Sequence, residues 1–318
     1  MHRRRFLQLM TAVLAATSLG GCSPSEPLRI GVHPWIGYES LYLAEEFGWL
    51  PDRLQLVKQH AASHSIEGLI AGDLDAAALT LDEVLRVRGA GVPVRIVTVT
   101  DVSVGADVLL VRPGIDHLTD LPGRRVAVEL DAVSGVMLFA VLDAAGLGTD
   151  DISVVDMPVN EHAEAWRRGI IDASVNYEPE ASRLEAMGAV RLFDSSQLPE
   201  TIFDVLVVTE EAAESRPEAI RALVRAHFLG LQHMVRNLHD SVYRIASRQD
   251  ISPALVRQSM ATVMLPELSA NHRYLARNGR LNLVANQLEI VLLREGLMKA
   301  RSDVRPVADA SFLPRSLP

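Results

Sequence analysis

The order of hydrophobic and polar positions in residues 28–50 predicts one β-loop-α unit. Residues 28–32 place Leu, Ile and Val at every second position, which is the period of a half-buried strand. Pro34 ends this strand because proline has no N–H to donate to a neighbouring strand. The apolar positions from Leu41 to Phe47 then follow the three-to-four-residue spacing of a helix that packs back on the sheet.

The loop of this unit contains two aromatic residues, Trp35 and Tyr38. In open α/β sheets, ligands bind in the crevice beyond the carboxyl ends of the strands, so aromatic side chains at this point are candidates for lining a pocket. The same position also suits aromatic residues that only cap the core. Position alone therefore leaves both roles open for these two residues.

Strand and helix patterns continue to alternate through the first two thirds of the chain. We expect strands at 54–58, 75–79, 94–99, 107–111, 125–129, 152–157, 172–177 and 204–209. Amphipathic helices are expected between them at 64–72, 81–89, 133–146, 160–168 and 179–188. This alternation is typical of parallel or mixed sheets covered by helices, which is the α/β class.

The pattern changes at Ser215, after which nearly all of the chain has the period of a helix. Ser215 and Glu218 have the spacing of a capping box, and Pro217 suits the first turn of a helix. We expect helices at 217–236, 239–248, 252–264, 270–278 and 281–299.

Two segments repeat each other without a gap, GDLDAAALTLDEVL at 72–85 and GIIDASVNYEPEAS at 169–182. The repeat aligns Gly72 with Gly169, Asp75 with Asp172, Ala76 with Ala173, and Thr80 with Tyr177. Each copy has the pattern of a helix end, a glycine turn, a strand and a new helix. Coincidence is the alternative, since similar units recur widely for packing reasons. A genuine repeat predicts two equivalent strand ends that face each other across a cleft, as in a clamshell.

Two segments are candidate hinge crossovers between such lobes, 103–114 and 199–212. Each contains an apolar run introduced by Asp, and together they bracket the second copy of the repeat. Hinges are a few backbone positions at the ends of elements, where rotation is absorbed as domains close on a ligand. We therefore place lobe I at 27–104 plus 210–300, lobe II at 105–209, and a C-terminal tail at 301–318.

The N-terminus has the features of an export signal. Residues 1–21 have a basic start, small final residues and an apolar middle that is too short to span a membrane. The arginines at 3–5 resemble a twin-arginine signal, and LGGC at 19–22 resembles a lipoprotein box. We expect residues 1–21 to be removed, Cys22 to carry a lipid and residues 22–27 to form a tether. An unprocessed apolar N-terminus is the alternative.

Composition narrows the class of protein further. Cys22 is the only cysteine, so the chain forms no intramolecular disulfide. Removal of residues 1–21 takes away three arginines and no acid, which leaves 28 basic and 40 acidic residues and a formal net charge of −12. An acidic surface excludes nucleic acid as the expected partner. A hydrophobic fraction of 48% is enough for the cores of two lobes.

Several segments together carry a resemblance to a known family. They are LRIGVHPWIGYESLYLAEEFGW, GDLDAAALTLDEVL, GVPVRIVTVTD, IDHLTDLPGRRVAVE and the NYEP turn. In order and spacing they resemble the solute-binding proteins of ABC importers, in the group that includes nitrate, alkanesulfonate, taurine and thiamin-pyrimidine binders. The resemblance implies a type II periplasmic-binding fold with two α/β lobes and a ligand in the cleft. It also implies a monomer without a cofactor. The lipid would hold this protein outside the cytoplasm, in the periplasm or on the outer face of the cytoplasmic membrane. There the protein would deliver its solute to an ABC permease with its ATPase.

The resemblance also implies which residues line the pocket. In the family they come from the loop after the first strand, from turns after later strands of lobe I, and from helix N-termini of lobe II. Transferred to this chain, they are Trp35, Tyr38, Thr80, Asp101, Ser103, Glu129, Ser134, Asn176, Tyr177, Glu178 and Asp204.

Two other functions use the same fold. A lipoprotein that senses a solute for a receptor uses the same cleft. Enzymes with this fold include one that makes a thiamin pyrimidine and one that dehydrates chorismate, but the first has a cysteine-rich iron site that this chain lacks. His60 and His64 have the spacing of metal ligands without a third ligand nearby, and His33 has no nucleophile motif beside it. We therefore expect neither catalysis nor a metal.

The charge of the expected site bears on the solute. Asp101, Glu129, Glu178 and Asp204 belong to the expected set, which has no Lys or Arg. Carboxylates favour a solute with N–H donors or a positive charge, stacked on an aromatic ring, as in a pyrimidine-like or amine solute. If these acids instead cap helices or pair with arginines, helix N-termini remain able to bind nitrate or a sulfonate.

Overall fold

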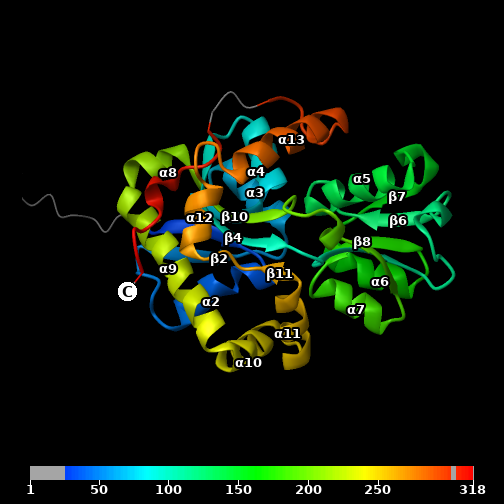
Figure 1. Cartoon of the computed structure of the whole chain (residues 1–318), viewed down its shortest axis with the longest axis horizontal. Coiled ribbons are helices and arrows are strands. Elements are labelled where there is room, and N and C mark those ends of the chain that lie inside the picture. Colours follow the sequence, from blue (N-terminus) through cyan, green and yellow to red (C-terminus); the bar gives the residue numbers. More distant parts are fainter. Residues whose placement is uncertain (1–25, 302–305, 318) are drawn as a thin grey trace, which may run out of the picture.

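The computed structural model describes residues 26–301 and 306–317. The expected signal at 1–21 and the lipidation site Cys22 lie outside the described residues. Within the described ranges, no helix is both long and apolar enough to cross a membrane. Two lobes, each built on one mixed sheet flanked by helices, lie side by side (Figure 1). The predicted two-lobed α/β architecture is thus confirmed.

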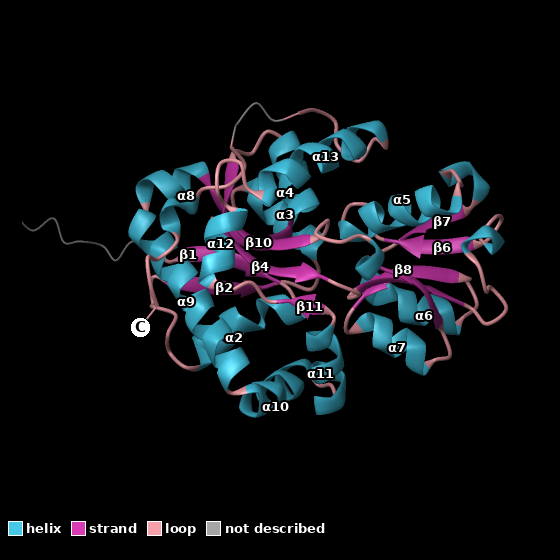
Figure 2. Cartoon of the chain, in the orientation of Figure 1, coloured by secondary structure: helices cyan, strands magenta, loops and turns pink. Residues whose placement is uncertain are grey.

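Lobe I contains the six-stranded sheet and most of the helices (Figure 2). From edge to edge its strands are β11 (Val263–Met264), β4 (Val94–Ser103), β10 (Phe203–Thr209), β3 (Ala76–Thr80), β1 (Leu28–Val32) and β2 (Leu54–Lys58). Its helices are α2 (Glu39–Glu46), α3 (Ala62–Ala71), α4 (Leu81–Gly89), α8 (Glu210–Ser215), α9 (Pro217–Arg236), α10 (Leu238–Gln249), α11 (Pro253–Ala261), α12 (Leu268–Tyr274) and α13 (Arg280–Arg294).

Lobe II contains the five-stranded sheet. From edge to edge its strands are β7 (Ser153–Asp156), β6 (Arg125–Val128), β8 (Ala173–Tyr177), β5 (Asp107–Val111) and β9 (Val190–Asp194). Its helices are α5 (Val133–Ala145), α6 (His162–Arg167) and α7 (Glu180–Ala186). The edge strands β9 and β11 are absent from the strands expected from sequence. All the other strands coincide with expected ones to within a few residues.

The two copies of the sequence repeat occupy equivalent places in the two sheets. The first copy follows α3 into β3 and α4, and the second follows α6 into β8 and α7. Each strand pairs in parallel with the strand two βα units earlier, β3 with β1 and β8 with β6, and antiparallel with a strand on its other side. The repeat therefore reflects two lobes of like topology, whose strands β3 and β8 end at the cleft.

Residues that are identical in the two copies of the repeat play equivalent structural roles. Gly72 and Gly169 both have positive φ, which glycine adopts without a steric penalty. Asp75 accepts a hydrogen bond from the backbone N–H of Arg29 at 2.8 Å, and Asp172 accepts the equivalent bond from Arg125 at 3.0 Å. Each aspartate thus fixes the start of one strand against its parallel neighbour.

The structure corrects the expected place of one strand. Residues 203–209 were expected in lobe II as part of 105–209, but they form β10 between β3 and β4 in the sheet of lobe I. The chain crosses between the lobes before this strand, at 195–202, and after β4, at 104–106. The two runs introduced by Asp are therefore strands, one in each sheet, and the crossovers precede them.

Two ends of elements also differ from expectation. Ser215 is the last residue of α8 and does not cap α9, whose N-cap is Arg216, although Pro217 does begin α9 as expected. Part of the expected C-terminal tail belongs to lobe I, because the Ile96 N–H donates to the Val307 carbonyl at 2.8 Å and Arg95 pairs with Asp309 at 2.7 Å. The tail thus adds a short extension beside β4.

Candidate functional site

The cleft between the lobes is bridged by two aromatic side chains. Trp35 follows β1 in lobe I, and Tyr177 is the last residue of β8 in lobe II. Their rings meet edge to face with centroids 5.7 Å apart and an interplanar angle of 87°. This arrangement is favourable for aromatic pairs, so the contact holds the lobes together across the cleft.

A small cavity, which we call the inner cavity, lies beside this aromatic pair. Its volume is about 20 Å³, which is room for about one water molecule. Trp35, Thr80 and Asp204 line it from lobe I. Asp107, at the start of β5, and Tyr177, at the end of β8, line it from lobe II. His33, Ala62, Glu83 and Val133 complete its wall.

Acidic groups dominate the inner cavity. Burial raises the pKa of Glu83 to about 8 and that of Asp107 to about 7, and it raises the pKa of Asp204 well above its usual range. Burial also lowers the pKa of His33 to about 4, so this imidazole is neutral at pH 7. None of the described residues that line the inner cavity is Lys or Arg. An entering group therefore meets acceptors and carboxyl groups.

Two polar atoms in the wall of the inner cavity have no hydrogen-bond partner. They are Oδ2 of Asp107 and Nδ1 of His33, which belong to residues only 3% and 6% exposed. A buried polar atom without a partner costs about 1–3 kcal/mol. These two atoms are the strongest local indication that the cavity accepts a polar group from a ligand.

A second layer of polar groups supports the inner cavity from behind. The indole N–H of Trp35 donates to Oδ2 of Asp101 at 2.8 Å, and the hydroxyl of Tyr38 donates to Asp204. Asp101 and Asp204 pair directly across β4 and β10, share a hydrogen bond, and both have a raised pKa because they are buried. Gly37 is required here, because a Cβ on it would lie 1.3 Å from Oδ2 of Asp101.

Helix α4 of lobe I holds the N-terminus of α5 in lobe II. Glu83 accepts hydrogen bonds from the N–H of Thr80 at 2.9 Å and from the N–H of Val133 at 3.3 Å. Arg86 donates to the carbonyls of Leu130 at 2.7 Å and Ala132 at 3.2 Å. The first turn of α5 is a natural anion site, and here the carboxyl group of Glu83 occupies it.

A larger space, which we call the outer cavity, lies beside the inner one and has a volume of about 470 Å³. Tyr177 lines both spaces and so forms a shared wall. Tyr42 of lobe I and Val159 and Pro179 of lobe II give the outer cavity apolar surface. Its size falls in the range of sites for organic ligands, whereas the inner cavity accepts only a small group.

Four of the residues expected from sequence line the inner cavity. They are Trp35, Thr80, Tyr177 and Asp204. The structure places Tyr38 and Asp101 in the layer behind them, where each is hydrogen-bonded to a cavity-lining residue. His33, Glu83 and Asp107 line the inner cavity without having been expected. The sequence did contain a signal for Asp107, because a charged residue at the start of an otherwise apolar strand is unusual.

The other expected residues lie outside the walls of both cavities, and all of them except Ser134 have a structural partner. The hydroxyl of Ser103 bonds that of Ser195 at 2.7 Å in the crossover, and Glu178 accepts from the N–H of Ser182 at 3.2 Å and lies 3.7 Å from Arg191. The remaining three are Glu129, which lies 3.5 Å from the N–H of Val159, Asn176, which bonds Ser174 at 3.3 Å, and Ser134, which is buried in the first turn of α5.

Comparison with known proteins identifies the family. Residues 21–240 match the sequence model of the NMT1-like family, so the chain belongs to that family. The taurine-binding periplasmic protein of Escherichia coli is 26% identical over 175 residues, which are 54% of each chain. The chain thus spans about half the length of that relative. The predicted resemblance to the group of solute-binding proteins is confirmed.

Solved structures share the fold over nearly the whole chain. The alkanesulfonate-binding protein of Xanthomonas axonopodis pv. citri, bound to MOPS, has a TM-score of 0.75 and 19% identity, and covers 90% of this chain and 99% of its own. A desulfurization enzyme, DSZB, has a TM-score of 0.67 and 17% identity, and covers 90% of this chain and 97% of its own. The fold thus serves both binding proteins and an enzyme. Among the described residues, no group of three or more His, Cys, Asp or Glu is arranged to hold a metal ion.

The raised pKa of Glu83 predicts a pH-dependent contribution to stability. Because folding raises this pKa from 4.5 to about 8, the folded protein holds the proton more tightly, and the resulting stability is lost as pH rises towards 8. We therefore expect the free energy of unfolding of the wild type, relative to Glu83→Gln, to fall between about pH 5 and pH 8. Urea denaturation at several pH values measures this difference.

The matched control is Glu45→Gln, since Glu45 is exposed on α2 and far less buried than Glu83. Its difference from the wild type should not change over the same pH range. Equal pH profiles for the wild type and Glu83→Gln would contradict the assignment of a raised pKa to this carboxyl group.

Proposed function

We propose that this chain is an extracytoplasmic solute-binding protein of an ABC importer. It captures a small polar organic solute between its lobes and delivers it to a membrane permease with its ATPase. The observation that carries the proposal is the inner cavity, which residues of both lobes line and which contains two buried polar atoms without partners. The names of the taurine-binding and alkanesulfonate-binding relatives support this role.

We further propose that the group bound in the inner cavity is a hydrogen-bond donor or a cation. Glu83, Asp107 and Asp204 line this cavity, and burial raises the pKa of each. A donor or a cation bound there stabilises their ionised form, whereas an anion raises these pKa values further. An anion at the first turn of α5 would have to displace Glu83 from the Val133 N–H. An amine, an amidine-like group or an amino-pyrimidine edge supplies a donor for the unpartnered oxygen of Asp107.

The proposal includes the cellular location and the oligomeric state of the protein. Lipidation at Cys22 would tether an otherwise soluble monomer outside the cytoplasm, in the periplasm or on the outer face of the cytoplasmic membrane. This arrangement suits delivery to a permease, because the tether keeps the protein near the membrane. A solute sensor for a receptor would use the same cleft, and the presence of neighbouring permease and ATPase genes would distinguish transport from sensing.

Asp107→Asn is the variant that tests the charge of the solute. It keeps the shape of the side chain and removes the carboxylate that has an unpartnered oxygen in the inner cavity. Binding of an aminopyrimidine or alkylamine should weaken by about 1.5–3 kcal/mol, the value of a hydrogen bond to a charged group. Isothermal titration calorimetry with these compounds, and with taurine, an alkanesulfonate and nitrate, measures the change.

Asp143→Asn is the charge-matched control, since Asp143 is exposed on α5 and lines neither cavity. It should bind like the wild type. If the wild type binds nitrate or an alkanesulfonate without an amine in the micromolar range and none of the amines or pyrimidines, the proposed solute chemistry is wrong. Taurine carries an ammonium group, so its binding does not contradict the proposal. Tighter binding of those anions by Asp107→Asn would identify the inner cavity as an anion site.

The lipid anchor makes a separate prediction. Cys22→Ala should be exported and recovered in soluble fractions, because acyl chains supply membrane affinity of about 0.8 kcal/mol per buried CH₂. Fractionation of cells expressing the wild type and the variant, followed by a salt wash of the membranes, measures the distribution. A variant that stays entirely with the washed membranes would contradict lipidation at this cysteine.

A further inference from the structure

The two cavities of the cleft differ in charge. The inner cavity has carboxyl groups and no cationic side chain among its described lining residues. The outer cavity has acids and bases together, with Lys58, Arg183 and Arg248 against Glu39 and Glu180. A solute that extends from one cavity into the other therefore passes from an acidic region into one that also offers cations.

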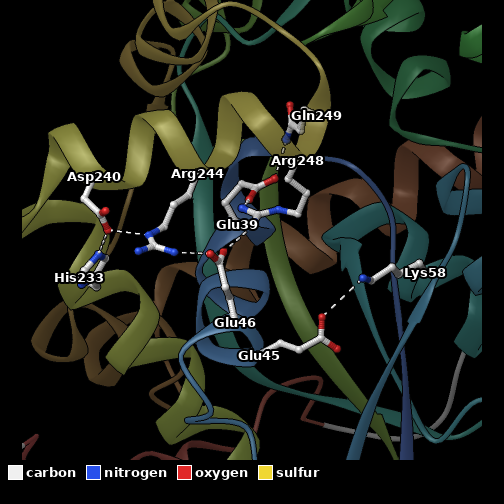
Figure 3. Close-up of polar contacts among 9 residues, drawn as sticks. All are labelled: Glu39, Glu45, Glu46, Lys58, His233, Asp240, Arg244, Arg248 and Gln249. Carbon is white, nitrogen blue, oxygen red and sulfur yellow. Dashed lines mark hydrogen bonds and ion pairs between the residues drawn. The ribbon is translucent and has the colours of Figure 1, made fainter.

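Most of the cations around the outer cavity are already neutralised at close range. Arg248 pairs with Glu39 and Glu46 in a network that joins α10 to α2, as Figure 3 shows. Arg183 pairs with Glu180, three residues earlier on the same helix. Glu39 and Glu180 are in the wall of the outer cavity, so they neutralise the charges of Arg248 and Arg183 at close range.

Lys58 is held much more weakly. Its ammonium lies 3.6 Å from a carboxylate oxygen of Glu45, and the side chains are 65% and 41% exposed. An exposed ion pair of this kind contributes little to stability, so an anionic group of a ligand competes easily with Glu45 for the ammonium of Lys58. The ammonium also lies 5.9 Å from the centre of the Tyr42 ring, which is another wall of the outer cavity. Figure 3 shows Lys58 separate from the arginine network.

We infer that the solute has two unlike ends and that Lys58 determines the specificity for the outer one. A donor-bearing or cationic end enters the inner cavity, and an anionic or acceptor end at the other side of the molecule meets the Lys58 ammonium. The body between them lies against Tyr42 and Tyr177 in the outer cavity, whose 470 Å³ accommodates an organic molecule. This inference rests on the proposed function, since it assumes that the inner cavity binds the donor-bearing end.

Titrations with three homologous series test the inference. The probes are unbranched α,ω-amino carboxylates of two to eight carbons, the n-alkylamines of the same lengths and the matching n-alkanoates. In the wild type, an amino carboxylate of optimal length should bind about two- to fivefold more tightly than the amine of that length, as expected for an exposed ion pair. Lys58→Gln should remove this advantage and leave the binding of the amine unchanged.

The sequence provides a matched control, because the chain contains only two lysines, Lys58 and Lys299. Lys299 is exposed after α13 and lines neither cavity, so Lys299→Gln should behave like the wild type. Reductive methylation with ¹³C also gives two lysine NMR signals besides that of the N-terminus. The amino carboxylate should shift the signal of Lys58 and leave that of Lys299 in place.

The outcomes separate this inference from the proposal on which it rests. If amines and amino carboxylates bind equally, or if Lys58→Gln weakens both to the same extent, the role of Lys58 is refuted and the donor-binding inner cavity stands. If only alkanoates bind, or if no probe binds, the donor-binding inner cavity itself fails and the inference fails with it.

Discussion

Burial of carboxyl groups where the lobes meet is the constraint that governs the cleft. Glu83, Asp101, Asp107 and Asp204 are at most 3% exposed, and a carboxylate in such a place requires a proton, a donor or a cation. The chain supplies part of this requirement itself, through the Trp35 indole, the Tyr38 hydroxyl and the N–H of Val133. One oxygen of Asp107 receives no such bond, so a ligand can supply the missing hydrogen-bond donor there.

The same contacts relate binding to closure. Glu83 and Arg86 reach from lobe I to the first turn of α5, and Trp35 meets Tyr177 across the cleft. A group that enters the inner cavity therefore contacts side chains from both lobes at once. Free energy gained there favours the closed arrangement over an open one, which is how a ligand shifts a conformational equilibrium. The like topology of the lobes makes this possible, because it brings the ends of β3 and β8 to the same cleft.

Much of the fold was predictable from the sequence because it depends on local periodicity. Alternating apolar positions identify the buried strands, and the repeat of Gly72 and Asp75 at Gly169 and Asp172 indicates two like lobes. The lobe to which β10 belongs was not predictable, since its pairing with β3 and β4 spans more than a hundred residues. The edge strand β9 has a mixed burial pattern, which gives little periodicity to recognise.

The candidate site was predictable only in part for a related reason. Trp35, Thr80 and Tyr177 follow or end strands, so their place at the cleft follows from topology. Glu83 and Asp107 reach the cavity through the relative placement of the lobes, which the pattern of one segment does not contain. Glu178 shows the converse, because its neighbours in sequence suggested the cleft whereas Arg191 and Ser182 hold it elsewhere.

The most direct measurement is the identification of the solute that the purified protein retains. Native mass spectrometry detects the complex, and mass spectrometry after denaturation identifies the released compound. The account predicts an organic solute with N–H donors or a positive charge, retained by the wild type and lost from Asp107→Asn. A retained nitrate or donor-free sulfonate, or a solute held equally by both proteins, would contradict it.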